Sequence, residues 1–408
     1  MTLFATMRAP RTIVFGSGQR HALADYARAL GQKALIVTDE RMGGSAEVSA
    51  MVDKLKAAGV ETRVFDRTLP EVPLDCIAEC VAFGRSFGPD LVIGLGGGSC
   101  LDMAKVTAVL LAHGGSPRDY YGEFKVPGPV LPLIAIPTTA GTGSEATPVA
   151  VVADSERLLK VGIASPQIIP LVAICDPELT LTAPRSLTAI AGADALTHAI
   201  EALTAGPRTV DARISHEHVF LGKNALSDSN AREAIRHLAR GLKRAVDNGQ
   251  DISAREDVMY GALLAGLAFG SAGTAAAHAI QYPVGALTHT AHGAGVACLM
   301  PYVMAFNLSH ATASIADVAH AMGVAERGDS DAANAERAIV AVETLFADIG
   351  IPKDLKALGL AGDKLDWTAE QSLGAARLVK NNPRPLDLAA MQAIVRAAYA
   401  GNRSLLSN

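Results

Sequence analysis

Side chains in the C-terminal half of the sequence have the types and spacing that suit ligands of one divalent metal ion. A predicted helix carries Asp194 and His198 four residues apart, so both side chains point from one face of that helix. A later segment adds His278 and then His289 and His292, and the spacing does not choose between the last two. A carboxylate combined with imidazoles suits Fe²⁺ or Zn²⁺, which accept mixed oxygen and nitrogen ligands.

An Asp-x-x-x-His pair by itself is more often an ordinary helix pair than a metal site. The prediction therefore depends on the histidine-rich segment. Pro283 and Gly285 interrupt that segment, and both residue types disfavour the interior of a helix. We expect this break to place His278 on one helix and His292 at the start of the next.

A glycine-rich turn in the N-terminal half has the composition of a phosphate-binding loop. Gly96, Gly97, Gly98 and Ser99 follow an apolar strand and precede a predicted helix. Glycines let the backbone approach a pyrophosphate, and a helix N-terminus favours its negative charge. Such a turn is often only a tight strand–helix connection, and no GxGxxG fingerprint follows the first predicted strand. We include these four residues, with Asp102 in the helix that follows, among the candidate dinucleotide-binding residues.

Polar residues also follow two other predicted strands. Asp39 ends the strand expected over 34–38, where a carboxylate can accept hydrogen bonds from ribose hydroxyls and would repel a 2′-phosphate. This position predicts NAD rather than NADP, although Asp39 could instead only cap the next helix. The loop that carries Thr138, Thr139 and Thr142 could hold phosphate and ribose, or be an ordinary turn.

The elements that must position these residues change character along the chain. In the first ~180 residues, β-rich runs alternate with amphipathic helical patterns, which predicts a parallel sheet covered on both faces. The expected strands span residues 12–15, 34–38, 61–65, 90–94 and 131–136, with further short runs at 149–153, 159–163 and 171–174. Helical patterns lie between them, at 21–30, 46–58, 74–87 and 100–113.

From Ser186 onward the sequence is rich in alanine and leucine and has helical periodicity. Pro184 is a plausible break before this region. We therefore expect an α/β dinucleotide-binding domain over residues 1–183 and an all-helical metal-binding domain over residues 184–408. The expected helices of the second domain include residues 186–205, 231–248, 254–272 and 332–349.

The composition argues against several classes of protein. A net charge of −5 without a dense run of basic residues gives no electrostatic case for nucleic acid. No long uncharged apolar run or signal-peptide pattern is found, which predicts no membrane association. Five scattered cysteines without a CxxC pair favour a reducing cytoplasm. We expect a cytoplasmic enzyme acting on a small molecule, and the alanine-rich helices of low charge predict a homo-oligomer, with a homodimer as the first candidate.

Several motifs together resemble those of the iron-containing (group III) alcohol dehydrogenase family. The runs over 175–201 and 278–295 resemble the two signatures of that family, and the runs over 96–99 and 137–145 resemble further motifs in the same order. The resemblance covers nearly the whole chain. It implies a fold of the dehydroquinate-synthase type and hydride exchange between a primary or secondary alcohol, or the aldehyde or ketone, and a nicotinamide cofactor.

The resemblance also implies a ligand set. It places Fe²⁺, or alternatively Zn²⁺, on Asp194, His198, His278 and His292, and it thereby excludes His289. The ion is expected to act as a Lewis acid on the substrate oxygen during hydride exchange.

One position departs from the family pattern. Many members carry a histidine four residues after the third ligand, and this sequence has Tyr282 there. A tyrosine at this place is similar to the hydroxyacid–oxoacid transhydrogenase branch, as is the stretch over 221–228. Tyr282 and His289 are therefore both candidates for relaying a proton. Lys160 matches a family lysine near the nicotinamide ribose.

Other functions compete with that of an NAD-dependent dehydrogenase. A transhydrogenase would keep its cofactor bound while a hydroxyacid and an oxoacid trade hydride. A maleylacetate-reductase-like enzyme usually lacks a metal, and glycerol dehydrogenases and dehydroquinate-synthase-like lyases have other ligand sets. A non-catalytic regulator would bind metal without hydride transfer.

Overall fold

In a computed structural model, which describes residues 3–154, 156 and 159–406, the chain divides into two units. The α/β unit contains Arg8–Thr182 and Arg213–Val219. The helical unit contains residues 3–7, Ala183–Ala212 and the described residues from Phe220 onward.

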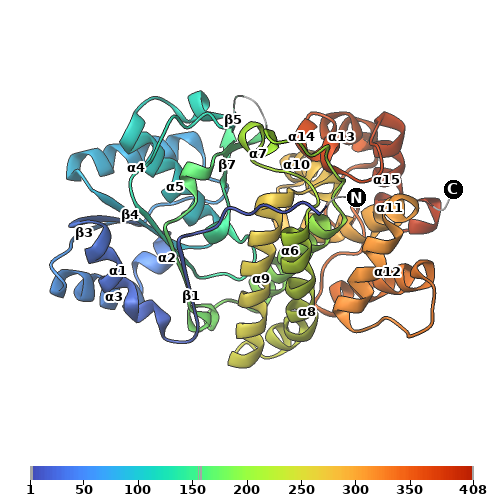
Figure 1. Cartoon of the computed structure of the whole chain (residues 1–408), viewed down its shortest axis with the longest axis horizontal. Helices are drawn as coiled ribbons and strands as arrows, with labels where there is room; N and C mark the ends of the chain where they lie inside the picture. The colour runs from blue at the N-terminus through green and yellow to red at the C-terminus, as the bar shows by residue number, and fades with distance from the viewer. Residues whose placement is uncertain (1–2, 155, 157–158, 407–408) are drawn as a thin grey trace. The chain divides into compact units, whose positions relative to one another are not determined.

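A six-stranded parallel sheet forms the centre of the α/β unit (Figure 1), with the strand order β1-β9-β6-β4-β2-β3. Its strands are β1 (Thr12–Phe15), β2 (Lys33–Val37), β3 (Glu61–Phe65), β4 (Leu91–Gly96), β6 (Leu133–Pro137) and β9 (Val172–Cys175). Three strands make a second, smaller sheet: β5 (Gly122–Glu123), β8 (Leu159–Ala164) and β7 (Val149–Asp154). The predicted parallel sheet is confirmed.

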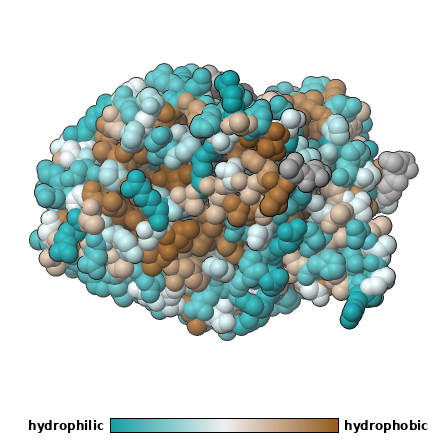
Figure 2. All heavy atoms as spheres, viewed as in Figure 1, coloured by the Kyte–Doolittle hydropathy of each residue, from teal (hydrophilic) through white to brown (hydrophobic). Residues whose placement is uncertain are grey.

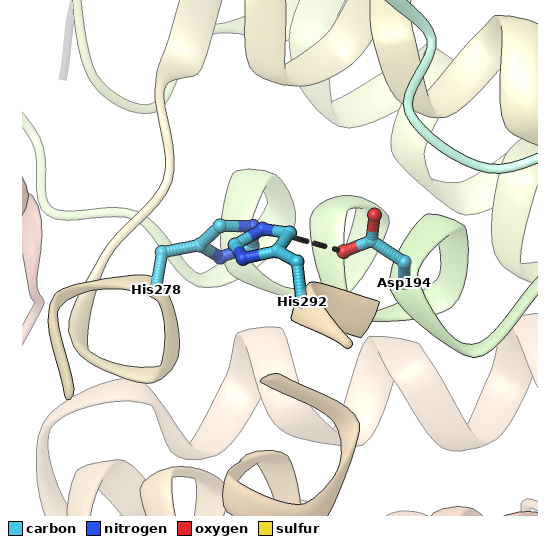
Figure 3. Close-up of side chains that lie close together, drawn as sticks. All are labelled: Asp194, His278 and His292. Carbon is cyan, nitrogen blue, oxygen red and sulfur yellow. Dashed lines mark ion pairs between the residues drawn. The ribbon is translucent and has the colours of Figure 1, made fainter. Parts of the chain in front are cut away.

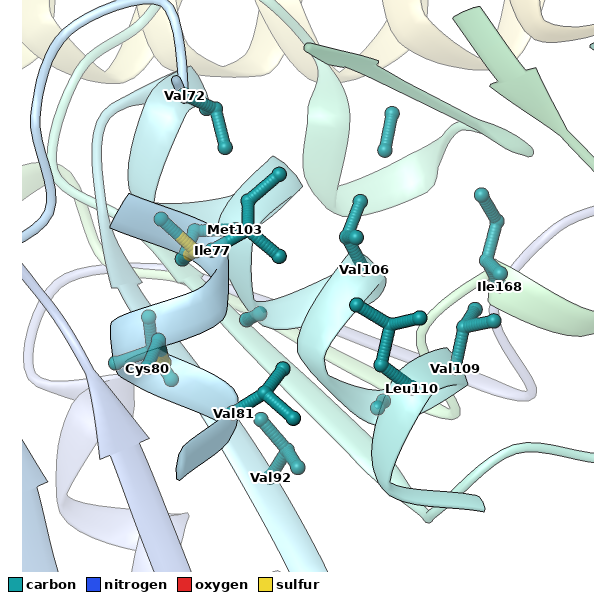
Figure 4. Packing of buried hydrophobic residues seen from close by; sticks show 14 of the residues in the cluster. Val72, Ile77, Cys80, Val81, Val92, Met103, Val106, Val109, Leu110 and Ile168 are labelled. Atoms are coloured by element: carbon teal, nitrogen blue, oxygen red, sulfur yellow. The ribbon is translucent and has the colours of Figure 1, made fainter. Parts of the chain in front are cut away.

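Helices cover both faces of the large sheet because side chains alternate along each strand. Leu35 and Val37 of β2 belong to one hydrophobic cluster, and Ala34 and Ile36 belong to another. The first cluster includes residues of α4 (Leu74–Phe87) and α5 (Gly98–His113), whose packing Figure 4 shows. The second includes residues of α1 (Leu23–Leu30), α2 (Glu40–Gly43) and α3 (Ala46–Ala57).

The helical unit follows the alanine- and leucine-rich sequence. Its longer helices are α6 (Arg185–Thr204), α8 (Ala225–Asp247), α9 (Ile252–Ala272), α10 (Ala276–Thr288), α11 (His292–Met322), α12 (Asp331–Asp348) and α15 (Leu388–Ala400), with the shorter α13 (Leu365–Ser372) and α14 (Ala376–Asn381). Hydrophilic residues predominate over the amphipathic α12 on the face in Figure 2. Among the described residues, no single helix is long and apolar enough to span a bilayer, and only the bent pair α9 and α10 meets that test together.

Two short segments belong to the other unit from the one that the expected domain ranges assigned them to. The backbone carbonyl of Phe4 accepts a hydrogen bond from Ala225, and that of Thr6 accepts one from Ser271, so the N-terminal segment belongs to the helical unit. The segment Arg213–Val219, which includes α7 (Ile214–Glu217), belongs to the α/β unit. Long-range hydrogen bonds of this kind leave no local sequence signal.

The expected break at Pro283 was wrong. Pro283 lies inside α10, and the helix ends instead at Thr288. A proline removes one N–H donor from a helix but does not by itself force the chain out of it. The helix ends where His289 takes a left-handed conformation with φ 54° while its N–H donates to the carbonyl of Gly285. The consequence for the site is as expected, because His278 lies on α10 and His292 is the first residue of α11.

Candidate metal and dinucleotide sites

One carboxylate oxygen in the helical unit faces three imidazoles. Oδ1 of Asp194 lies 3.7 Å from Nε2 of His198, 3.9 Å from Nε2 of His278 and 4.0 Å from Nε2 of His292. Ligand atoms of Asp194, His278 and His292 all lie within 4.8 Å of one another, and Figure 3 shows the two imidazoles near the carboxylate. The structure therefore brings Asp194, His278 and His292 together as one group, and it places His198 beside Asp194 but outside that mutually close group.

Two glycines let α11 approach its neighbours closely enough for His292 to reach this cluster. A Cβ on Gly293 would lie 2.5 Å from the carbonyl oxygen of Ile190 and 3.0 Å from Cβ of Asp194. A Cβ on Gly295 would lie 1.6 Å from Oε1 of Gln281 on α10. A side chain at Gly293 would push α11 away from α6 and would move His292 with it, whereas a side chain at Gly295 would displace the Gln281 side chain.

The side chains of the first three predicted ligands are buried, whereas that of His292 is partly exposed. The side chains of Asp194, His198 and His278 are 5–7% exposed and that of His292 is 31% exposed. The His198 ring stacks on Phe269, with 4.2 Å between the ring centroids. Of these four side chains, that of His292 is therefore the most accessible to solvent.

The donor set fits a transition-metal ion. Metal–ligand bonds of about 2.1 Å in a tetrahedral site separate ligand atoms by roughly 3.4 Å, so the observed separations from Asp194 need to shorten by only a few tenths of an ångström. Nε2 of His278 is buried and has no hydrogen-bond partner among the described residues. The Nδ1 atom of the same ring lies 2.6 Å from Oε2 of Glu201. A buried imidazole nitrogen that faces a carboxylate without bonding to it is what an absent cation would leave.

The two relay candidates lie in different environments. The Tyr282 ring lies beside that of His292, with 6.5 Å between the centroids. Burial raises the pKa of Tyr282, and the charge of Arg377 opposes this rise, so the phenol stays protonated near neutral pH. His289 is exposed and forms the C-terminal cap of α10.

The dinucleotide candidates gather at the carboxyl ends of three adjacent strands. Asp39 follows β2, the glycine-rich turn follows β4, and Thr138 follows β6. The chain leaves β2 for β3 on one side and returns to β4 on the other side of β2. Strand ends at such a reversal are where open parallel sheets bind nucleotides.

The glycine-rich turn packs closely against the loop over residues 138–144, the threonine loop. A Cβ on Gly98 would lie 2.6 Å from Cγ2 of Thr142, and a Cβ on Gly97 would lie 3.5 Å from Thr139. Gly96 has φ 146°, which favours glycine, and a Cβ there would lie 2.6 Å from Sγ of Cys100. The N-terminus of α5 emerges from this turn, so backbone N–H groups and the helix dipole both favour an anion there.

Asp39 caps the next helix, which was one of the two roles expected for it, and its position at the end of β2 still permits the other, contact with a ribose. Its Oδ1 accepts from the N–H of Met42 at 2.8 Å, which caps α2. Its Oδ2 lies 3.9 Å from the Cβ position of Gly96 on the neighbouring strand. The hydroxyl of Thr138 is buried without a hydrogen-bond partner among the described residues. These polar atoms fit a nucleotide at the strand ends.

Both carboxylate oxygens of Asp102 accept hydrogen bonds from other residues of the chain. Oδ1 accepts from the hydroxyl of Ser144 at 2.6 Å, and Oδ2 accepts from the N–H of Val151 at 2.9 Å. These two hydrogen bonds connect α5 to Ser144 and to β7, and a contact between Asp102 and the cofactor remains a prediction.

Lys160 has a partner that the sequence did not indicate. Its Nζ lies 2.7 Å from Oε1 of Glu71, and the N–H of Glu71 donates to the Ser99 hydroxyl at 3.2 Å. Glu71 and Val72 both have positive φ, 65° and 57°, and such strain is often found at binding sites. The lysine proposed for the nicotinamide ribose is thus connected to the glycine-rich turn.

Sequence reasoning missed two buried charges behind this turn. Lys105 is fully buried, and its ammonium donates to the carbonyls of Thr147 and Val149 and to the Thr147 hydroxyl at 2.8–3.1 Å. Burial lowers the pKa of Lys105 to about 8 and raises that of Glu145 to about 7. A lysine among the mostly apolar residues of α5 was the available signal.

A parallel-sheet edge suited to a nucleotide, together with a carboxylate–histidine cluster that could hold a metal ion, is what a metal-dependent dehydrogenase would need. Comparison with known families agrees. The model described as "Iron-containing alcohol dehydrogenase" matches residues 10–177, and "Fe-containing alcohol dehydrogenase family, C-terminal" matches residues 188–399. The chain belongs to the iron-containing alcohol dehydrogenase family, and it is an alcohol–aldehyde oxidoreductase.

Individual relatives match over nearly their whole length. Long-chain-alcohol dehydrogenase 1 of Geobacillus thermodenitrificans (strain NG80-2) is 38% identical over 390 residues, which are 95% of this chain and 94% of the relative. A crystal structure of 1,3-propanediol oxidoreductase has a TM-score of 0.90 at 34% identity and covers 97% of this chain and 100% of its own. Sulfoacetaldehyde reductase from Bifidobacterium kashiwanohense, solved with NAD⁺, has a TM-score of 0.83 at 26% identity, with coverage of 98% and 99%.

Proposed function

We propose that the chain transfers hydride between a small alcohol and NAD, and that Asp194, His198, His278 and His292 hold the divalent metal that this needs. The observation that carries the proposal is the position of Asp194 Oδ1 within 4.0 Å of three imidazole Nε2 atoms. Fe²⁺ is the first candidate and Zn²⁺ the second, since both accept this mixed ligand set.

The bound ion would supply Lewis acidity at the substrate oxygen. The chain's own residues would control access to the cluster and bind the substrate oxygen. The three buried ligands keep water away from one side of the cluster, and the exposed His292 leaves the other side accessible. Tyr282 beside it stays protonated and can donate a hydrogen bond to a substrate oxygen.

NAD is proposed over NADP because Asp39 places a carboxylate at the end of β2. A ribose 2′-hydroxyl can donate to this carboxylate, whereas a 2′-phosphate would be repelled. The turn of Gly96–Ser99 would hold the pyrophosphate at the N-terminus of α5. Thr138, Thr139, Thr142 and Lys160 remain proposed contacts to phosphate and ribose.

A metal-reconstituted assay tests the proposal. Metal-free protein would be loaded with Fe²⁺, Zn²⁺ or Mn²⁺ and given NAD or NADP with short alcohols, diols and ω-hydroxyacids. We expect NADH formation only in loaded samples and with NAD preferred. Equal activity of the metal-free protein would contradict the proposal.

One observation favours a second candidate, hydride exchange between a hydroxyacid and an oxoacid. The guanidinium of Arg377 on α14 lies 4.0 Å from the centroid of the Phe220 ring, and its charge acts on Tyr282. A positive charge that acts on Tyr282, whose ring lies beside that of His292, suits a substrate with a carboxylate. A transhydrogenase would turn over a hydroxyacid only with an oxoacid present and would need little added NAD. Arg377→Gln should then raise KM for hydroxyacids more than for uncharged alcohols.

We further propose that the enzyme is a cytoplasmic homodimer. Its five cysteines are all free and buried, as suits a reducing compartment, and hydrophobic residues reach the surface on the face in Figure 2. Light scattering after size-exclusion chromatography tests the dimer: a mass of one chain would contradict it.

A further inference from the structure

A buried carboxylate behind the metal cluster is left over once the four ligands are assigned. Glu201 lies on α6, three residues after His198, and is 1% exposed. Its Oε1 accepts from the N–H of Ala277 at 2.8 Å, and its Oε2 accepts from the N–H of Ala275 at 2.8 Å. The same Oε2 lies 2.6 Å from Nδ1 of His278. All three partners belong to the start of α10.

These contacts determine which nitrogen of His278 carries its proton. A carboxylate only accepts hydrogen bonds, so Nδ1 of His278 must be the donor. A neutral imidazole has one N–H, and Nε2 is therefore left with a lone pair. That nitrogen is the one that lies 3.9 Å from Asp194 Oδ1 without a hydrogen-bond partner among the described residues.

We propose that Glu201 is a positioning residue that fixes His278 in its Nδ1–H form and holds the ring so that Nε2 presents its lone pair to the metal. This inference rests on the proposed metal site. Carboxylates that accept from a ligand histidine in this way orient the ring and raise its basicity, and their loss typically weakens metal binding about 10–100-fold. The alternative is that Glu201 only caps the start of α10 through its two backbone contacts.

Three variants separate positioning from capping. Glu201→Met keeps a side chain of similar length but removes both carboxylate oxygens and leaves only a weakly accepting sulfur. Glu201→Gln keeps one oxygen, which can still accept from His278. Asn381→Ser is the matched control, because Asn381 bonds the carbonyls of Ala272 and Thr274 at the same α9–α10 junction without touching His278.

The first readout is the protonation of His278 in the metal-free full chain, from long-range ¹H–¹⁵N spectra of protein labelled with ¹⁵N-histidine. We expect the Nδ1–H form in the wild type, in Glu201→Gln and in Asn381→Ser. We expect Glu201→Met to shift toward the Nε2–H form. A wild-type protein with Nε2 protonated would overturn the proposal, and this measurement stands even if Glu201→Met does not fold.

The second readout is the Kd for Zn²⁺, from competition with a chromophoric chelator. Glu201→Met should bind about 10–100-fold more weakly, Glu201→Gln should lie between it and the wild type, and Asn381→Ser should bind normally despite a lower Tm. Equal weakening in Asn381→Ser would show that a loosened junction suffices and would overturn the positioning role. Failure of the proposed function looks different, because the wild-type chain itself would then bind no Zn²⁺.

Discussion

The hydroxyl of Ser144 donates a hydrogen bond to Oδ1 of Asp102 at 2.6 Å, and this contact joins the threonine loop to α5. The other oxygen of Asp102 accepts from Val151 at the start of β7. The motif over 137–145 and the helix that follows the glycine-rich turn are thus parts of one hydrogen-bonded arrangement.

This arrangement predicts that Asp102 acts on NAD indirectly. Asp102→Ala leaves the Ser144 hydroxyl and the Val151 N–H without their acceptor, at a cost of about 1–3 kcal/mol for each buried group. We expect a lower free energy of unfolding in urea together with a raised KM for NAD. Ser144→Ala should lower the free energy of unfolding less and raise the KM for NAD less than Asp102→Ala does. A raised KM with unchanged stability in Asp102→Ala would instead favour direct contact between Asp102 and the cofactor.

Glu145 predicts a pH dependence of stability. Burial raises the pKa of Glu145 to about 7, although Lys105 opposes the rise. The folded chain therefore holds this proton more tightly than the unfolded chain, so the favourable contribution is complete below pH ~4.5 and is lost as pH rises through ~7. The loss approaches roughly 3.4 kcal/mol when the full difference between pKa 4.5 and about 7 is expressed.

The measurement is urea unfolding between pH 5 and pH 7.5 for the wild type and Glu145→Gln. The variant should lose less stability over this range, because its amide does not titrate. Identical pH profiles would show that Glu145 ionises as easily in the folded chain as in the unfolded one.

The ligand assignment predicts opposite results for two histidines eleven residues apart. His278→Ala removes a buried ligand and should abolish stoichiometric metal binding and lower kcat/KM by more than about a hundredfold. His289→Ala changes an exposed helix cap and should leave bound metal unchanged. Metal analysis of the purified variants decides this, and equal metal content in the two would mean that the cluster is not the metal site.

The position of Asp39 predicts a change in cofactor preference. Asp39→Asn keeps a side chain that can cap α2, since asparagine caps helices as well as aspartate does, but it removes the charge. We expect little change in Tm and a lower KM for NADP relative to that for NAD. Unchanged preference would assign Asp39 to capping alone. Asp39→Ala, which also loses the cap, should in addition lose about 0.5–2 kcal/mol of stability.

The sequence by itself determined the elements and most of the site chemistry. Alternating β-rich runs predicted the parallel sheet, and strands such as Thr12–Phe15 and Glu61–Phe65 have the expected bounds. The four-residue spacing of Asp194 and His198 is a local property of one helix, so the pattern was enough to pair them. The choice of His292 over His289 came from the family motifs rather than from spacing.

Only the tertiary structure decided how these residues work together. Glu201 reaches His278 across 77 positions of sequence, Asp102 reaches Ser144 across 42, and α11 can approach α6 because Gly293 has no Cβ. Such contacts depend on how helices and loops pack, which the local periodicity of a sequence does not specify. For the same reason α10 continued through Pro283, because a proline removes one backbone donor but the packed helix retains its other contacts.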